Sequence, residues 1–195
     1  MKHSYYFLAI AFLLVYVISA SAQGPAATQQ FSREGVTFNY PTGWAFSDSS
    51  TQNAVEMTFG NANLDANLRF FVFRTPLTSP EKLAEARKIL VDRYIDATTK
   101  SFAGANAKPV SSPSTSEIAA IKAEGVKIKA TLNSIARTTE IEWAVVENRM
   151  VVLTMLGPDK EFAKAAPLWD MVRTTLKIEP LPKPAPATTP TPKKP

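Results

Sequence analysis

Short runs of alternating apolar and polar residues in the first part of the chain predict strands. Residues 36–40 (VTFNY) alternate with a period of two, which is the pattern of a half-buried strand. The next three residues, 41–43 (PTG), predict a turn, because proline fixes φ and glycine accepts a positive φ. Residues 54–59 predict another strand. Residues 68–75 (LRFFVFRT) are apolar in both phases, so we expect both faces of that strand to be covered.

A change to three- and four-residue spacing predicts one long helix over residues 79–104. Ser79 can accept a hydrogen bond from the first turn, and Pro80 suits the first helical position. Gly104 is expected to end the helix. The apolar stripe expected to face the core comprises Leu83, Ala86, Leu90, Tyr94 and Ala97.

The pattern changes again after this helix. Prolines and hydroxyl side chains in residues 105–117 predict an exposed loop. Residues 118–132 predict one or two strands, broken near Gly125. Two further apolar runs flank Asn148-Arg149, which predicts a hairpin because asparagine tolerates the left-handed conformation of such turns.

The last predicted element is a helix that starts near Asp159. Proline lacks a backbone N–H and crowds the preceding turn, so Pro167 predicts a short first turn and a helix that restarts there. Strands in runs, with two helices between and after them, predict a single α+β domain built on an antiparallel sheet of six or seven strands.

The two ends of the chain differ in composition from the rest. A basic start, an apolar run and the small-x-small Ala20-Ser21-Ala22 predict a cleavable signal peptide; an uncleaved N-terminal anchor is the alternative. The C-terminal end, with 7 prolines among the 16 residues from Pro180 to Pro195, favours an extended, disordered segment. The predicted organisation is a signal peptide (1–22), a short flexible segment (23–28), a globular domain (29–178) and a proline-rich tail (179–195). We therefore expect an exported, periplasmic or extracellular protein without a membrane span after cleavage.

Two residue types that carry much of enzyme chemistry are missing from the predicted mature chain. The sequence has no cysteine, and its one histidine, His3, lies in the predicted signal peptide. This excludes nucleophilic systems with an imidazole base, Cys/His zinc sites and thiol redox chemistry. We expect no catalytic residues, no cofactor and no metal.

Charge excludes a further class of partner. The net charge of the whole chain is +5, but residues 29–178 hold only 18 of its 22 basic residues against 16 of its 17 acidic ones. A nucleic-acid-binding face would be strongly basic, so no nucleic-acid partner is expected. The lysines of the tail, Lys183, Lys193 and Lys194, could tether the protein weakly to an anionic surface.

The segment 38–44 (FNYPTGW) resembles the opening of the Mog1/PsbP-like superfamily, with Tyr40-Pro41-x-Gly43-Trp44 as its near-motif. The order of predicted elements over residues 30–178 is similar too. The resemblance implies an antiparallel sheet sandwiched between helices. Well-known members are an extrinsic subunit of photosystem II and a nuclear-transport factor that binds a small GTPase, and neither is an enzyme. Metal ligands of the PsbP type include histidine, so a metal role does not carry over to this chain.

Two polar patterns are candidates for a calcium site and for a catalytic carboxylate pair. Residues 61–67 (NANLDAN) place oxygen-bearing side chains at alternate positions, as a calcium loop does, but Ala66 and Val72 stand where such a loop needs glycine and glutamate. A turn-forming loop is the favoured interpretation. Glu140 and Glu142 could form a catalytic carboxylate pair, but their alternation with apolar residues favours the solvent face of a strand.

Three aromatic residues, Tyr40, Trp44 and Trp169, are candidates either for a ligand cleft or for the core. Export, the missing catalytic residue types and the resemblance together predict a non-enzymatic binding or assembly module of the cell envelope, with an envelope protein as partner. Two alternatives stay open. The first is a carrier of a small apolar or lipid ligand, and the second is an enzyme that uses only carboxylate, lysine or serine chemistry.

Overall fold

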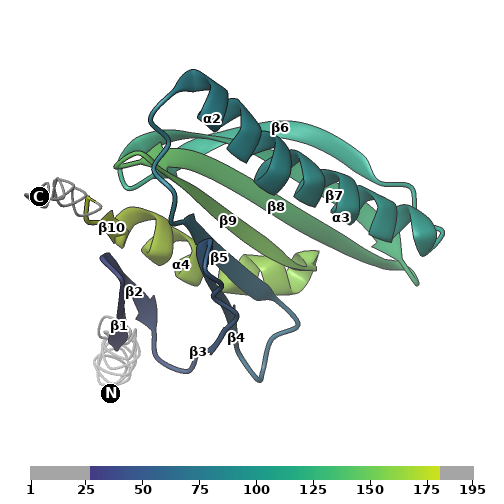
Figure 1. Cartoon of the computed structure of the whole chain (residues 1–195). Coiled ribbons are helices and arrows are strands. Elements are labelled where there is room, and N and C mark those ends of the chain that lie inside the picture. The colour runs from purple at the N-terminus through teal and green to yellow at the C-terminus, as the bar shows by residue number, and fades with distance from the viewer. Residues whose placement is uncertain (1–26, 181–195) are drawn as a thin grey trace, which may run out of the picture.

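The computed structural model describes residues 27–180, which form two antiparallel sheets and two helical layers (Figure 1). The predicted signal peptide and all but the first two residues of the predicted tail lie outside the described residues. The larger sheet has seven strands, in the spatial order β3 (Ala45–Asp48), β4 (Ala54–Gly60), β5 (Asn67–Phe73), β9 (Arg149–Pro158), β8 (Ile135–Val146), β7 (Ile121–Leu132) and β6 (Val110–Ile118). The smaller sheet comprises β1 (Thr28–Arg33), β2 (Val36–Pro41) and β10 (Lys177–Ile178).

Helices cover both faces of the large sheet, as the resemblance implied (Figure 1). One face carries the long helix, which consists of α2 (Pro80–Ala86), η1 (Arg87–Asp92) and α3 (Arg93–Gly104). The other face carries α4 (Asp159–Thr175) and the small sheet. Each face has its own apolar core, because alternate residues of the central strands point to opposite sides. The predicted α+β sandwich is therefore confirmed.

The long helix has the predicted extent, but its apolar stripe differs from the predicted one. Ser79 caps it as expected, and α3 ends at Gly104. The segment η1 is π-helical, so the buried residue after Ala86 is Val91, five positions later. Two members of the predicted stripe, Leu83 and Ala97, are exposed instead. One extra residue in the turn shifts the register after it, which explains the exposure of Ala97 but not that of Leu83, which precedes the turn. Leu90 and Tyr94 still pack against the core.

The predicted loop over residues 105–117 is wrong, because most of it belongs to β6. This strand forms one edge of the large sheet and pairs only with β7. Pro113 lies in its middle, which an edge strand tolerates since one side of it has no partner strand. Most of the strand is exposed, so it lacks the apolar alternation that would have revealed it.

The turns of the second half also differ from the prediction. Strand β7 runs unbroken through Gly125, and the break lies at Ala119 and Ala120, which have φ of 52° and 60°. The predicted hairpin between β8 and β9 is present, but its turn residues are Glu147 and Asn148. Asn148 is left-handed as expected, with φ of 57°.

Helix α4 does not restart at Pro167, as predicted, but runs continuously from Asp159 to Thr175. A proline inside a helix costs about 3 kcal/mol. Burial of an aliphatic or aromatic side chain contributes about 1.5–3 kcal/mol, so a few contacts with the sheet outweigh that cost. The buried residues of α4 stand on both sides of the proline; they are Glu161, Ala165, Leu168, Trp169 and Val172.

Candidate functional site

The three aromatic residues selected from the sequence lie in the core beneath α4. Tyr40, Trp44 and Trp169 are buried to 6%, 9% and 5% exposure. The ring of Tyr40 lies 5.3 Å from that of Phe59, edge to face. None of the three lines the cavities described below.

The polar loop over residues 61–67 is built around its own turn. The side chain of Asn61 accepts the backbone N–H of Asn63, and its carbonyl accepts that of Leu64. Asp65, the one carboxylate of the segment, pairs with Arg137. The carboxylate of Asp65 is thus paired with a guanidinium, which supports the interpretation of residues 61–67 as a turn-forming loop.

The prediction that Glu140 and Glu142 lie on a solvent face is wrong. Both are buried, at 8% and 2% exposure, because α4 covers that face of β8. Glu140 pairs with Lys127 at 3.3 Å, and Glu142 lies 3.7 Å from a guanidinium nitrogen of Arg173. Burial raises the pKa of Glu142, an effect that the hydroxyl of Ser116 and the charge of Arg173 partly offset.

On the opposite face, a groove follows the side of the long helix. Three adjoining cavities make it up, with volumes of about 300, 390 and 200 Å³. The first shares Tyr94 and Ala97 with the second, and Ile89 and Leu90 with the third. We call this feature the helix groove.

The helix groove exists because the long helix covers only part of the sheet. Its core contacts reach β5, β7, β8 and β9, and the first cavity stays open beside it over parts of β4, β5 and β9. Figure 1 shows the helix lying across this face of the sheet. The floor of the first cavity is formed by Phe71, Val152 and Thr154. At the rim stands Ile89, which is 47% exposed and belongs to the π-helical segment. Such segments often mark functional sites.

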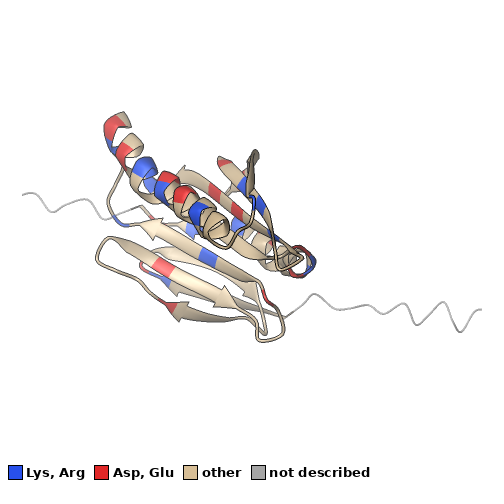
Figure 2. Cartoon of the chain, turned by 90° about the vertical axis from the view of Figure 1, so that its right-hand side faces the viewer, with Lys and Arg blue, Asp and Glu red and all other residues tan. Residues whose placement is uncertain are grey.

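The floor of the first cavity is mainly apolar, and its lining holds two arginines and one glutamate. Charges of both signs alternate along the long helix (Figure 2). Two arginines line the first cavity, Arg69 from β5 and Arg93 from α3. Arg69 lies 3.8 Å from the carboxylate of Glu56 and 6.0 Å from the centre of the Tyr94 ring. Arg93 forms no salt bridge among the residues that the structure describes. The site can therefore receive an apolar group next to an anionic one.

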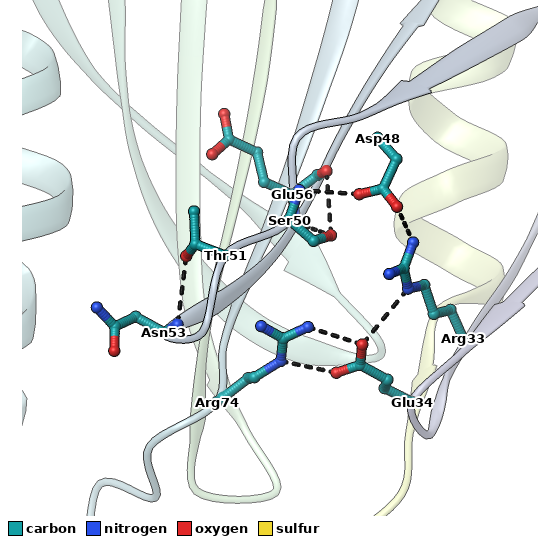
Figure 3. Close-up of polar contacts among 8 residues, drawn as sticks. All are labelled: Arg33, Glu34, Asp48, Ser50, Thr51, Asn53, Glu56 and Arg74. Carbon is teal, nitrogen blue, oxygen red and sulfur yellow. Dashed lines mark hydrogen bonds and ion pairs between the residues drawn. The ribbon is translucent and has the colours of Figure 1, made fainter.

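A second polar cluster joins the two sheets (Figure 3). Arg74, just after β5, donates two hydrogen bonds of 2.7 Å to the carboxylate of Glu34 in the β1–β2 turn. Arg33 also contacts Glu34, at 3.4 Å, and pairs with Asp48 of β3. The Arg74 hydrogen bonds hold the pKa of Glu34 below its usual value of 4.5.

This pairing predicts an acid-sensitive contribution to stability. A carboxylate with a lowered pKa in the folded state stabilises the fold above its unfolded-state pKa, and the contribution disappears as the pH falls through the folded-state value. Glu34→Gln should lower the free energy of unfolding by about 0.5–1 kcal/mol at neutral pH, the range of a partly exposed ion pair. Urea unfolding at pH 7, 5 and about 3 should show this difference shrinking toward zero.

Glu147→Gln is the matched control, because Glu147 is also exposed and has φ of 49°, against 50° for Glu34. It forms no salt bridge within residues 27–180, so the substitution should change stability little at any pH. A Glu34→Gln difference that stays constant down to pH 3 would contradict the ionic explanation.

Sequence reasoning missed Arg149, which it placed in the turn of the predicted hairpin. It is the first residue of β9 and is 1% exposed. Its Nε donates to the carbonyl of Phe73 at 3.0 Å, so the guanidinium attaches the end of β5 to the hairpin. No signal in the sequence distinguishes this arginine from a solvated one, because the loop after β5 supplies its cover.

No family model and no curated protein matches this chain. Several solved structures do match this chain. The solution structure of cyanobacterial PsbP (CyanoP) from Synechocystis sp. PCC 6803 matches with a TM-score of 0.53 and 14% identity, over 83% of this chain and 98% of that one. A crystal structure of a protein from Bacteroides thetaiotaomicron matches with a TM-score of 0.51 and 15% identity, over 81% of this chain and 51% of that one.

A structure of protein Mog1 gives a TM-score of 0.46 at 13% identity, over 80% of this chain and 97% of that one. At such identities a likeness shows the fold and not the function. The likeness to CyanoP, with its TM-score of 0.53, confirms the fold expected from the Tyr40-Pro41-x-Gly43-Trp44 motif.

Proposed function

We propose that this chain, with its PsbP-like fold, is an exported, non-enzymatic binding module of the cell envelope whose partner protein lies in the helix groove. The observation that carries the proposal is the groove itself, which is open, elongated and apolar at its floor. It follows a helix of residues 80–104, and three cavities adjoin along it. An extended segment of a partner fits such a shape better than a compact molecule does.

The chemistry of the rim indicates which types of residue the partner segment should carry. Ile89 offers an exposed apolar contact, and Arg93 offers a cation beside it, whereas Arg69 is shared with Glu56. A segment with apolar side chains and an acidic residue next to them would complement both.

Export is part of the proposal and rests on the signal-like residues 1–22. Within residues 27–180, no helix is long and apolar enough to cross a membrane. Lys183, Lys193 and Lys194 add a weak, salt-sensitive attraction to anionic envelope surfaces.

The alternative of a small apolar or lipid ligand is favoured by one observation, the first cavity of about 300 Å³, with Phe71, Leu90 and Val152 in its lining. An enzyme restricted to carboxylate, lysine or serine chemistry has less support. Beside its arginines, the first cavity holds Glu56, Tyr94 and Thr154 as polar groups, and no hydroxyl–carboxylate hydrogen bond joins these three.

A pair of matched variants tests the proposal. Ile89→Glu places a charge in the helix groove, whereas Ile135→Glu alters a residue that is equally exposed, at 50%, and lines none of the three cavities. In affinity capture from envelope extract, Ile89→Glu should reduce recovery of the specific partner about tenfold or more, the effect of a central interface residue. Ile135→Glu should leave recovery unchanged.

Two further measurements separate the alternatives. Capture lost on removing residues 181–195, but not on Ile89→Glu, would assign binding to the tail and contradict the proposal. Mass spectrometry of organic extracts from the purified protein addresses the carrier alternative. A lipid that is retained by Ile135→Glu and lost from Ile89→Glu, without a protein partner, would replace the module by a carrier.

A further inference from the structure

Buried polar atoms without a hydrogen-bond partner gather at one place beneath α4. Within residues 27–180 there are five such side-chain atoms, and four of them belong to Ser114, Ser116, Glu142 and Arg173. These residues come from β6, β8 and α4. Unpaired buried polar groups are rare and costly, so four in one cluster indicate a site.

The strand register explains how the cluster forms. Ser114 lies opposite Gly125, and Gly125 lies opposite Glu142, so the three residues form one row across β6, β7 and β8. A Cβ atom on Gly125 would lie 2.5 Å from Ser114 Oγ and 3.2 Å from Glu142 Cγ. The missing side chain therefore lets the serine and the glutamate approach each other over the strand between them.

The side chain of Glu142 is buried, and charged groups of α4, β7 and β8 lie near it. Arg173 of α4 faces it at 3.7 Å but also donates a 2.6 Å hydrogen bond to Asp170, which is exposed. Glu140 on the same strand is paired with Lys127 of β7 at 3.3 Å. On β9, Leu153 stands opposite and contributes no charge.

One guanidinium, shared with another carboxylate, the hydroxyl of Ser116 and the more distant charge of Lys127 are therefore all that offset the burial of this acid. A buried carboxylate with such limited compensation is destabilised relative to its neutral form. The neutral acid suits the site better, because it needs no counter-ion and can donate a hydrogen bond to a serine hydroxyl. Internal water commonly satisfies the remaining atoms of such a cluster.

We propose that Glu142 is an internal proton-binding site that strengthens the packing of α4 on strands β6 and β8 as the pH falls. The burial-raised pKa of Glu142 agrees with this geometry. A carboxyl that binds its proton more tightly in the folded state than in the unfolded state lowers stability at neutral pH. That loss is recovered as the pH falls through the folded-state pKa. Glu142 thus acts in the direction opposite to Glu34.

The direct test is a carbon-13 NMR titration of the side-chain carboxyl of Glu142 in the wild-type protein. We expect its midpoint above the ordinary glutamate value of 4.5. A midpoint at or below that value would overturn the proposal. This measurement needs no variant, so it holds even where a substitution fails to fold.

The second test compares Glu142→Gln with the wild type in urea at two pH values. The amide keeps the shape and removes the charge, so the urea midpoint should rise at pH 7 and the gain should shrink toward pH 4. Glu140→Gln is the matched control on the same strand and should lower the midpoint at pH 7, since it leaves Lys127 without its partner. A merely structural role predicts that Glu142→Gln lowers the midpoint equally at both pH values, which would overturn the proposal.

Discussion

Phe38→Ala should lower the free energy of unfolding by about 3–5 kcal/mol, the range for a buried phenylalanine. Phe38 is 1% exposed and stands where the small sheet meets the large one. Its ring lies 4.8 Å from that of Phe31, 5.6 Å from that of Phe59 and 5.0 Å from that of Phe70. The substitution removes contacts within the small sheet and contacts to the large sheet at once, so the loss should be near the upper end. Urea unfolding at neutral pH measures it.

Phe46→Ala is the matched control for this prediction. Phe46 belongs to the same aromatic cluster, with its ring 5.6 Å from that of Phe59, but it lies on the edge strand β3 and is 46% exposed. Its truncation leaves little cavity and should cost about 1 kcal/mol or less. Equal losses for the two variants would show that the small sheet is not packed on the large one as described.

Trp44→Ala should cost a similar 3–5 kcal/mol, because it opens a cavity in the core beneath α4. Trp44 follows the turn at Gly43, whose φ is 87°, and is 9% exposed. The turn directs the chain so that the indole enters the core immediately before β3. The change in unfolding free energy, measured in urea, decides between a core role and a ligand-cleft role for this residue.

Thr42→Ala, in the same turn, provides the comparison for Trp44. Thr42 is exposed, and only its backbone N–H is engaged, with the carbonyl of Ala27. Its substitution should stay within about 0.5 kcal/mol of the wild type. A loss below about 0.5 kcal/mol for Trp44→Ala as well would exclude it from the core and make it a candidate for ligand contact.

Local patterns predicted those elements whose signals are local. The alternation in residues 36–40 and the two apolar phases of residues 68–75 predicted β2 and β5, since a half-buried and a fully covered strand differ in their sequence. Ser79 and Pro80 predicted the start of the long helix, because a cap acts within one turn. The Tyr40-Pro41-x-Gly43-Trp44 motif added the layer arrangement, which the matched structures share.

The elements that were predicted wrongly depend on partners distant in sequence. Strand β6 exists because β7 supplies hydrogen bonds along one side of it, and its exposed, serine-rich sequence carries no apolar pattern. Pro167 stays within α4 because the sheet binds residues on both sides of it. In each case a tertiary contact outweighs a local preference.

The candidate sites depend on the same distinction. Periodicity placed Glu140 and Glu142 on one face of a strand, and that part of the prediction holds. Whether the face meets water or another layer is not encoded in the strand, and α4 covers it. The helix groove likewise depends on the position of the long helix on the sheet and on the π-helical register of η1. No single residue of the groove determines either of these. The sequence by itself determined the strands, caps and shared faces, because these follow from covalent geometry over a few residues. Only the tertiary structure decided which faces are covered, because coverage requires segments that meet across the whole chain.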